Sequence, residues 1–243
     1  MKKFLVIGNP INNSLSPKLH NYWIKKSKID AIYDKKLLNE SELKNLISQI
    51  KTGEISGINV TVPFKNSVIP FIDELSLEAK KTQSVNTIYY KNNKIIGHNT
   101  DIGGFELGIR HFKYNVTGKS VLVLGAGGVA PSIVYALKKM FPDIEIIDWG
   151  KSGEFNMIVN ATSIGLKDTD EINLNFNDFG KNRFFYDLIY NPRETNFLKK
   201  AKEMGNQTEN GKMMFIYQAH QAFAVWHKIL PKIDDETIKL LDG

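Results

Sequence analysis

Short apolar runs alternate with longer amphipathic stretches along the first hundred residues. Each apolar run predicts a buried strand, and each stretch with apolar residues three or four positions apart predicts a helix. Ser16 is expected to be the N-cap of the first helix, because Pro17 suits the first helical position. Two strands separated by Lys91-Asn92-Asn93 indicate a hairpin, which after a βαβ-like region predicts a mixed sheet. The expected strands are residues 4–7, 32–38, 57–62, 87–90 and 94–97, and the expected helices are residues 16–26 and 41–50.

The second half opens with a strand, a glycine-rich turn and a helix in immediate succession. Strands and helices continue to alternate after it, which is the order of a parallel α/β sheet. Gly103-Gly104 is expected to be a flexible join, so we place a domain boundary near residues 101–104. The expected strands are residues 119–124, 144–147, 156–161 and 184–188, and the expected helices are residues 105–111, a segment ending near 140, 194–204, 212–227 and 234–241.

Length and composition indicate an ordinary globular protein. A chain of 243 residues forms one large domain or two small ones. With 24% charged residues and no run near the roughly 18 apolar residues of a membrane span, a membrane protein is not expected. The apolar run after Met1-Lys2-Lys3 is too short for a signal peptide. The absence of cysteine excludes disulfides and a cysteine nucleophile, and it fits a reducing, cytoplasmic location.

The formal net charge of +6 comes from 32 lysines and arginines against 26 aspartates and glutamates. The lysines are scattered, whereas a surface that follows nucleic-acid phosphates needs clustered charge. We therefore expect no nucleic-acid binding, and the same excess suits a negatively charged substrate and cofactor. The five histidines show no ligand spacing, so no metal site is expected.

The segment Gly125-Ala126-Gly127-Gly128-Val129-Ala130 matches the G-x-G-x-x-A form of the dinucleotide-binding fingerprint. Its glycines allow a tight turn and a close approach of the backbone, so that helix N-terminal amides face a pyrophosphate. The strand before it and the helix after it favour a dinucleotide site over the alternative, a mere strand-to-helix turn.

Lys65 ends the apolar stretch that begins at Gly57, and the clusters Val85-Asn86-Thr87 and Asn99-Thr100-Asp101 also lie at strand ends. Strands that finish in polar residues are typical of a cleft, so Lys65 and Asp101 are expected to meet. A lysine beside a carboxylate suits proton transfer to a bound substrate. The alternative is a pair of solvent-exposed charges, which contribute little to stability.

Together with Ser14-Leu15-Ser16-Pro17 and Tyr217-Gln218-Ala219, these segments resemble the shikimate dehydrogenase family from Asn9 to Trp226. The resemblance implies an α/β fold of two domains. Residues 1–103, completed by the helices in 211–243, form a mixed-sheet substrate domain, and residues 104–210 form a Rossmann-like NADP-binding domain. The implied reaction is the reversible NADPH-dependent reduction of 3-dehydroshikimate to shikimate, a step of aromatic amino acid biosynthesis. It takes place in the cleft between the domains of a monomer or homodimer.

The resemblance also implies the residues of the site, with Lys65 as acid and base and Asp101 as its partner. Hydroxyls at a helix N-terminus suit a carboxylate, and neutral polar groups suit ring hydroxyls. The alternatives are an ordinary N-cap at Ser16, a polar turn at residues 162–163 and a core tyrosine at position 190. The implied substrate ligands are Ser14, Ser16, Thr61, Lys65, Asn86, Asp101, Tyr190 and Gln218, and the implied cofactor ligands are Gly125, Ala126, Gly127, Gly128, Val129, Thr162, Ser163, Gly211 and Met214.

The chain departs from the family after Met140, where the second nucleotide-binding strand and its helix are missing. That strand ends in an Asn-Arg-Thr-like segment whose arginine holds the adenosine 2′-phosphate, and the missing unit amounts to about 20 to 30 residues. If the unit is deleted, cofactor binding is weakened, and strands are left unpaired or residues 144–147 take its place. If a segment is omitted from the sequence, these difficulties disappear. We favour the omission because every other motif is intact.

Two further positions bear on the cofactor. Asp148 lies 23 positions after Gly125, the spacing of the ribose-binding acid of NAD enzymes, but the resemblance places it at the end of the third strand. Met213 stands where the family tends to have a glycine that approaches the nicotinamide. Two other functions therefore stay open: a quinate/shikimate dehydrogenase that uses NAD, and a non-catalytic shikimate-binding protein that has lost the nucleotide half.

Overall fold

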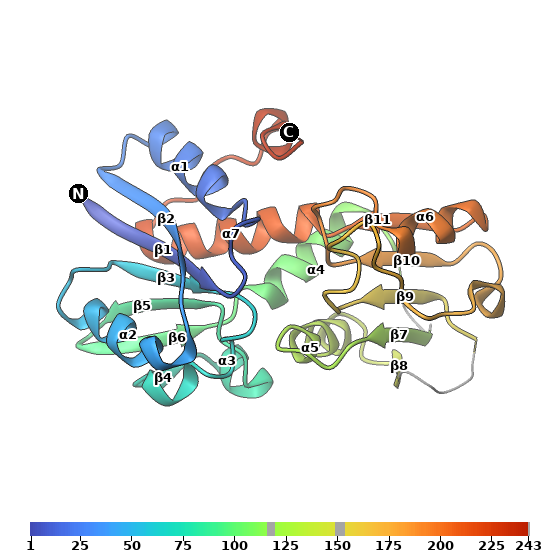
Figure 1. Cartoon of the computed structure of the whole chain (residues 1–243), viewed down its shortest axis with the longest axis horizontal. Helices are drawn as coiled ribbons and strands as arrows, with labels where there is room; N and C mark the ends of the chain where they lie inside the picture. Colours follow the sequence, from blue (N-terminus) through green and yellow to red (C-terminus); the bar gives the residue numbers. More distant parts are fainter. Residues whose placement is uncertain (116–119, 149–153, 243) are drawn as a thin grey trace. The chain divides into compact units, whose positions relative to one another are not determined.

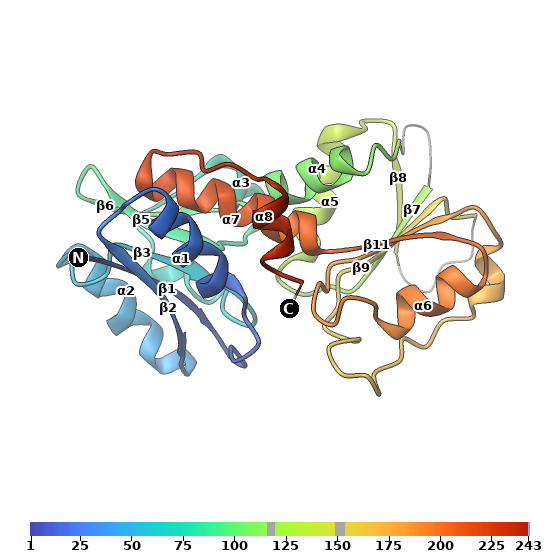
Figure 2. The same cartoon turned by 90° about the horizontal axis from the view of Figure 1, so that it is seen from above.

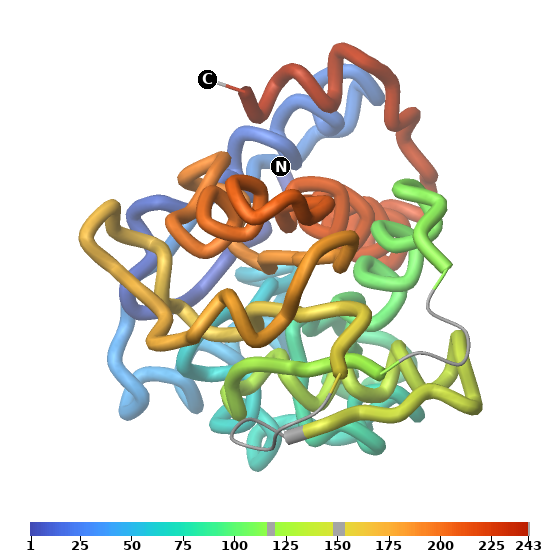
Figure 3. The backbone as a smooth tube through the Cα atoms, turned by 90° about the vertical axis from the view of Figure 1, so that its right-hand side faces the viewer, coloured from blue at the N-terminus to red at the C-terminus, as the bar shows by residue number. Residues whose placement is uncertain are grey.

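The computed structural model describes residues 1–115, 120–148 and 154–242, and Figure 3 traces the chain with the remaining residues in grey. The chain divides into a first unit, Met1–Gly104 with Ile216–Gly243, and a second unit, Phe105–Phe215. Each boundary falls within a helix, either α4 (Asp101–His111) or α7 (Lys212–His227). Both units are α/β structures, as predicted.

The first unit contains a six-stranded mixed sheet in the order β2-β1-β3-β5-β6-β4. Strands β2, β1 and β3 are parallel, whereas β5 pairs antiparallel with both β3 and β6. Asn92 and Asn93 have φ angles of 51° and 60°, the left-handed conformation of a tight hairpin turn, so the predicted hairpin is confirmed. The strands are β1 (Lys2–Gly8), β2 (Ala31–Leu37), β3 (Gly57–Val60), β4 (Glu74–Leu75), β5 (Thr87–Lys91) and β6 (Lys94–His98).

Helices cover both faces of this sheet, with α1 and α7 on one face and α2 on the other (Figures 1 and 2). On the α2 side, aliphatic residues of the helix and of β1, β3 and β5 form one buried cluster. On the other side, a Cβ at Gly57 would lie 2.4 Å from the indole nitrogen of Trp226, so this glycine lets α7 approach the sheet. The helices are α1 (Ser16–Lys26), α2 (Leu43–Lys51), α3 (Leu77–Thr82) and α8 (Asp235–Lys239), with 3₁₀ turns η1 (Glu40–Glu42) and η2 (Ile69–Phe71).

The second unit contains a five-stranded, fully parallel sheet in the order β11-β10-β9-β7-β8. Helices α5 and α6 lie on opposite faces (Figure 2), and a cluster of phenylalanines and aliphatic residues fills the α6 side. This is the Rossmann-like arrangement that was predicted. The elements are β7 (Ser120–Leu124), α5 (Ala130–Met140), β8 (Glu145–Asp148), β9 (Met157–Asn160), η3 (Phe176–Phe179), β10 (Phe184–Asp187), α6 (Asn196–Glu203) and β11 (Gln207–Asn210).

Between α5 and β8 the chain makes a tight turn, in which the Ile144 amide donates to the Phe141 carbonyl at 3.0 Å. β8 then pairs with β7, with Ile146 opposite Val121, and so occupies the position beside the first nucleotide-binding strand. The sequence as given therefore folds without the strand–helix unit, and the omitted segment that we favoured stays a prediction.

Several local predictions were wrong. Gly103 and Gly104 lie inside α4 and form no flexible join. A Cβ at Gly103 would lie 2.3 Å from Gln221 Oε1, so this glycine serves helix packing. Ser16 is not the N-cap of α1, because the cap is Leu15 and Ser14 Oγ accepts from the Ser16 amide at 3.4 Å. The short elements β4, α3 and β11 were not predicted, and Lys119, the expected start of β7, lies outside the described residues.

Within the described ranges, no helix combines the length and the apolar character that a membrane span requires.

Candidate functional site

Lys65 and Asp101 form a buried ion pair in the first unit, with 2.7 Å between Lys65 Nζ and Asp101 Oδ2. Lys65 follows β3 and Asp101 is the first residue of α4, and the two residues are only 8% and 5% exposed. A pair this deep differs from the solvent-exposed charges of the alternative interpretation. Burying two charges is unfavourable unless further hydrogen bonds satisfy them. The contribution of the pair to stability therefore depends on the groups around it.

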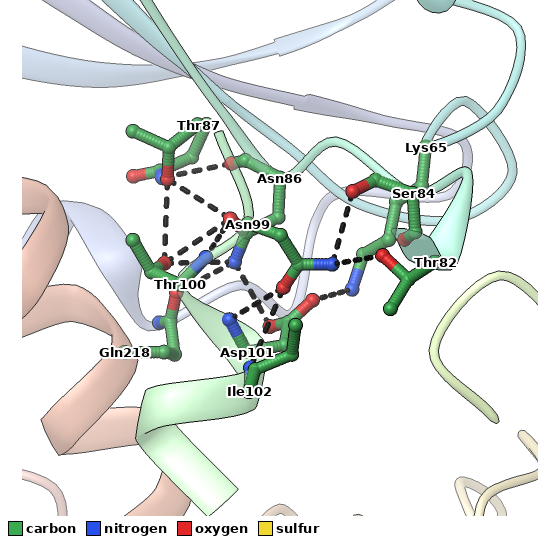
Figure 4. Close-up of polar contacts among 11 residues, drawn as sticks. Lys65, Thr82, Ser84, Asn86, Thr87, Asn99, Thr100, Asp101, Ile102 and Gln218 are labelled. Atoms are coloured by element: carbon green, nitrogen blue, oxygen red, sulfur yellow. Dashed lines mark hydrogen bonds and ion pairs between the residues drawn. The ribbon is translucent and has the colours of Figure 1, made fainter. Parts of the chain in front are cut away.

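Asn86 supplies the second partner of Asp101 (Figure 4). Its amide nitrogen donates to Asp101 Oδ1 at 2.9 Å and lies 3.4 Å from Gln218 Oε1 on α7. Its amide oxygen accepts from the Thr100 backbone at 2.8 Å, which fixes the orientation of the amide. Both carboxylate oxygens of Asp101 therefore have a donor, and three residues that the sequence predicted lie in one buried cluster.

Sequence reasoning assigned no role to the individual polar residues that support this cluster. Asn99 caps α4, because its side-chain oxygen accepts from the Asp101 amide at 3.0 Å, and its own amide donates to the Ser84 carbonyl at 2.9 Å. Asn59, inside the apolar run of β3, donates to Thr87 Oγ1 at 3.0 Å and accepts from the Tyr33 hydroxyl at 2.6 Å. An asparagine at a helix start and a polar residue inside an apolar run are the signals that could have indicated them.

Three further substrate candidates, Ser14, Ser16 and Thr61, lie beyond the carboxyl ends of β1 and β3, which are parallel neighbours. The Asn9 amide donates to the Val62 carbonyl at 2.9 Å, so the two connections run side by side. Ser16 is buried at the start of α1, whereas Ser14 and Thr61 are half-buried. A loop edge with three hydroxyls and a helix N-terminus suits a small polar anion.

In the second unit, residues 125–129 connect β7 to α5. Gly125 has a φ of 106°, and a Cβ there would lie 2.8 Å from the Thr162 methyl group, so a side chain is excluded. A Cβ at Gly127 would meet nothing within 4 Å, which leaves room for a ligand against the backbone. The tight turn, the open position and the start of α5 fit the pyrophosphate of a dinucleotide.

The segment after β9 is held by Asn160. Its side-chain oxygen accepts from the Thr162 amide at 3.0 Å and from Thr162 Oγ1 at 2.7 Å, and Thr162 Oγ1 accepts from the Ile164 amide at 3.0 Å. The Thr162 hydroxyl therefore orders the turn, as the alternative interpretation proposed, while Ser163 is exposed. A turn that is fixed internally can still present its backbone and Ser163 to a cofactor.

Two cofactor candidates, Gly211 and Met214, and one substrate candidate, Tyr190, remain. A Cβ at Gly211 would lie 2.1 Å from the Leu188 carbonyl oxygen, so only glycine fits there. Met214 is buried in α7, and the half-buried ring of Tyr190 stacks on Phe215 with 4.3 Å between centroids. Sequence reasoning assigned no role to Asp187, a fully buried carboxyl group whose pKa is raised to about 6 by its burial.

Comparison with known proteins adds independent evidence. The family model for the shikimate dehydrogenase substrate binding domain matches residues 6–88. A Pelagibacter ubique protein named shikimate dehydrogenase (NADP(+)) is 58% identical to this chain and covers 99% of both chains. An Aquifex aeolicus protein of the same name is 36% identical, over 91% of this chain and 90% of its own length.

The Pelagibacter alignment spans 262 positions, whereas this chain has 243 residues, so at least 19 positions are gaps in this chain. Such a gap agrees with the absence of the strand–helix unit.

Solved structures give the same result. A Thermus thermophilus shikimate 5-dehydrogenase in complex with NADP(H) and shikimate matches with a TM-score of 0.90 and 25% identity, over 100% of this chain and 99% of its own. The Aquifex aeolicus shikimate dehydrogenase matches with a TM-score of 0.86 and 33% identity, over 100% and 97%.

Proposed function

Because this chain belongs to the shikimate dehydrogenase family, we propose that it interconverts 3-dehydroshikimate and shikimate with NADP(H) as the cofactor. The observation that carries the proposal is the buried ion pair of Lys65 and Asp101, with Asn86 on the second carboxylate oxygen. We assign the substrate to the first unit and NADP(H) to the second. The product serves the biosynthesis of aromatic amino acids.

Lys65 is the proposed acid and base. When bound, NADPH supplies the hydride that reduces the ring ketone. Negative charge then develops on the ketone oxygen, and the Lys65 ammonium stabilises it and delivers a proton. In the direction of oxidation, Lys65 accepts the proton of the substrate hydroxyl. Asp101 holds Nζ of Lys65 at 2.7 Å, which orients the group that moves the proton.

The substrate is positioned by neutral groups. Ser14 and Ser16, at the N-terminus of α1, are assigned to its carboxylate, and Thr61, Asn86 and Gln218 to its ring hydroxyls, with Tyr190 as a further ligand. A site that hydrogen-bonds a hydroxyl discriminates strongly against analogues without it, because its polar groups are then left unpaired. Turnover of quinate would indicate a site that accepts a differently substituted ring, the alternative substrate.

The assigned cofactor ligands are residues 125–129, Thr162, Ser163, Gly211 and Met214, all within the second unit. The glycine-rich connection, residues 125–129, fits the pyrophosphate of the cofactor. The family's arginine segment for the 2′-phosphate has no counterpart between α5 and β8, so titration with NADPH and NADH separately is the decisive binding measurement. Tighter binding of NADPH supports the proposal. Tighter binding of NADH supports the NAD alternative, and binding of neither supports a non-catalytic shikimate-binding protein.

Replacement of Lys65 tests the proposed chemistry. Lys65→Ala is expected to lower kcat by about 10²-fold or more and to change substrate affinity far less, because a general acid acts mainly in the transition state. Lys94→Ala is the matched control, since Lys94 is also ion-paired, to Glu74 at 2.9 Å, but is exposed. Loss of affinity without loss of kcat would contradict the assigned role.

We further propose that the enzyme is a monomer or a homodimer in the cytoplasm. Sedimentation at micromolar concentration distinguishes the two assembly states, and a larger assembly would contradict both. Cell fractionation tests the location, for which the absence of cysteine is the supporting observation.

A further inference from the structure

Asp187 lies at the centre of three segments, two of which carry residues that we assigned to the cofactor, while the third carries Tyr190, which we assigned to the substrate. At the end of β10 it pairs in register with Asn160 of β9 on one side and with Asn210 of β11 on the other. The segments that follow these strands are residues 161–165, 188–191 and 211–214. Asp187 itself is fully buried and touches none of the reacting groups of the proposed mechanism.

The two carboxylate oxygens of Asp187 join these segments. Oδ1 accepts from Asn160 Nδ2 at 3.0 Å and from the Ile189 amide at 3.0 Å. Oδ2 accepts from Thr195 Oγ1 at 2.6 Å. In the described part of the chain, every hydrogen bond to this carboxylate comes from a neutral group, so the burial of its charge is not compensated by a cation.

An acceptor-only group at position 187 determines how Asn160 is oriented. The Asn160 amide nitrogen points to Asp187 and to the Ile164 carbonyl at 3.1 Å, which leaves its oxygen for Thr162. The Thr162 hydroxyl donates to the Asn160 oxygen. The oxygen of the same hydroxyl is then free to accept from the Ile164 amide. The geometry of the turn after β9 thus depends on the carboxylate.

The same residue fixes the segment after β10 and, through it, the start of α7. The Ile189 amide is held by Asp187, and the Ile189 carbonyl accepts from the Gly211 amide at 3.1 Å. A Cβ at Gly165 would lie 3.2 Å from both Ile189 and Thr195, so the first segment packs directly on the second. Displacement of Ile189 would therefore move all three segments.

We infer that Asp187 is a positioning residue for NADP(H): its buried carboxylate orients Asn160, Ile189 and Thr195 and so aligns the segments 161–165 and 211–214, which carry assigned cofactor ligands, through the segment 188–191 between them. The inference rests on the proposed binding of NADP(H) by the second unit. A buried carboxylate without a cationic partner lowers the free energy of unfolding, because its charge is removed from water without compensation. Residues that are unfavourable for stability are expected where function requires them.

The test compares Asp187→Ala with Asp187→Asn in steady-state kinetics. Asp187→Ala is expected to raise KM for NADPH by about tenfold or more and KM for 3-dehydroshikimate clearly less, because two of the misplaced segments carry assigned cofactor ligands and only Tyr190 in the third is assigned to the substrate. Asp187→Asn is expected to rescue binding. Its oxygen can accept from Asn160 and Ile189, while its amide donates to the Thr195 hydroxyl, which is both donor and acceptor.

Phe184→Leu is the stability control, since Phe184 is a buried residue of the same strand, at the end opposite Asp187. It is expected to leave KM for NADPH unchanged. If Asp187→Ala does not fold, Thr195→Val removes the donor to Oδ2 and should raise KM for NADPH by about threefold or more, whereas Thr195→Ser should not.

Three results would overturn the inference: an unchanged KM for NADPH in the folded Asp187→Ala or Thr195→Val variant, an equal rise in both KM values, or the same rise in Phe184→Leu. Failure of the wild-type chain to oxidise NADPH with 3-dehydroshikimate would instead contradict the proposed function.

Discussion

His20 gives the first unit a pH-dependent stability that can be calculated from its surroundings. The imidazole is 1% exposed, stacks on the Tyr33 ring at 4.2 Å between centroids, and lies near Trp23 and Trp226. Among the described residues neither ring nitrogen has a hydrogen-bond partner. Burial, with a smaller contribution from His227, lowers the pKa of His20 from 6.5 to about 3.

The sign of the effect follows from the two protonation equilibria. Below pH 6.5 the unfolded chain binds a proton at position 20, whereas the folded chain does so only near pH 3. Unfolding therefore takes up a proton in this window, and stability falls as the pH falls. From pH 7 to pH 5, His20 alone is expected to remove about 2 kcal/mol of the free energy of unfolding.

The assay compares wild type with His20→Phe, which keeps an aromatic ring but does not titrate. Urea unfolding at pH 7 and pH 5 can be followed by tryptophan fluorescence, since Trp23 and Trp226 adjoin His20. The variant should lose about 2 kcal/mol less stability than wild type between the two pH values. The comparison is needed because Asp187, with its pKa raised to about 6, stabilises the folded state as the pH falls.

Tyr33→Phe is the control, because it alters the same aromatic cluster without removing a histidine. It should retain the wild-type difference between pH 7 and pH 5. Equal losses in wild type and His20→Phe would refute the reasoning, since they would show that burial does not keep His20 neutral in the folded chain.

Three further substitutions test individual contacts. Gly127→Ala should change stability by less than about 0.5 kcal/mol but weaken NADPH binding in titration, whereas Gly125→Ala, at a positive φ, should lose about 1–3 kcal/mol of stability; a strong stability loss in the first would contradict the open space seen there. Gly211→Ala should destabilise the second unit by about 3 kcal/mol or more in urea unfolding because of its contact with Leu188, and a wild-type midpoint would show that contact to be wrong. Asn99→Ala should lose about 1–2 kcal/mol through the α4 cap and raise KM for shikimate, while an unchanged KM would separate the cap from the site.

The pattern of the sequence was sufficient to predict that Lys65, Asn86 and Asp101 lie together. Lys65 follows β3, Asn86 directly precedes β5 and Asp101 follows β6. Because β5 pairs antiparallel with both β3 and β6, its start lies beside the ends of the other two strands. The same logic predicted the glycine-rich connection, because a strand, a turn and a helix succeed one another locally. These predictions needed no information from distant parts of the chain.

The predictions that were wrong depended on distant contacts. Gly103-Gly104 is typical of a flexible join. In the structure Gly103 instead leaves room for the side chain of Gln221, which is more than a hundred positions away. Asn59 and Asp187 lie within predicted strands, and their roles follow from hydrogen bonds with residues of other strands. The place of β8 beside β7 is, by contrast, one of the two consequences that we expected of a missing unit, since an unpaired neighbour is unfavourable.

Asp101 and Asp187 show why residue type and position in the sequence were not enough to predict the role of a residue. Both are buried aspartates, Asp101 at the start of α4 and Asp187 at the end of β10. In both, one carboxylate oxygen accepts a hydrogen bond from an asparagine amide. The second oxygen of Asp101 faces the Lys65 ammonium, so that pair can move a proton, whereas the second oxygen of Asp187 faces the Thr195 hydroxyl. Because Asp187 has no cationic partner, burial raises the pKa of its carboxyl group. The role that we propose for Asp187 is to orient its neighbours. The partner on one oxygen is therefore the difference between the carboxylate that we propose for catalysis and the one that we propose for positioning.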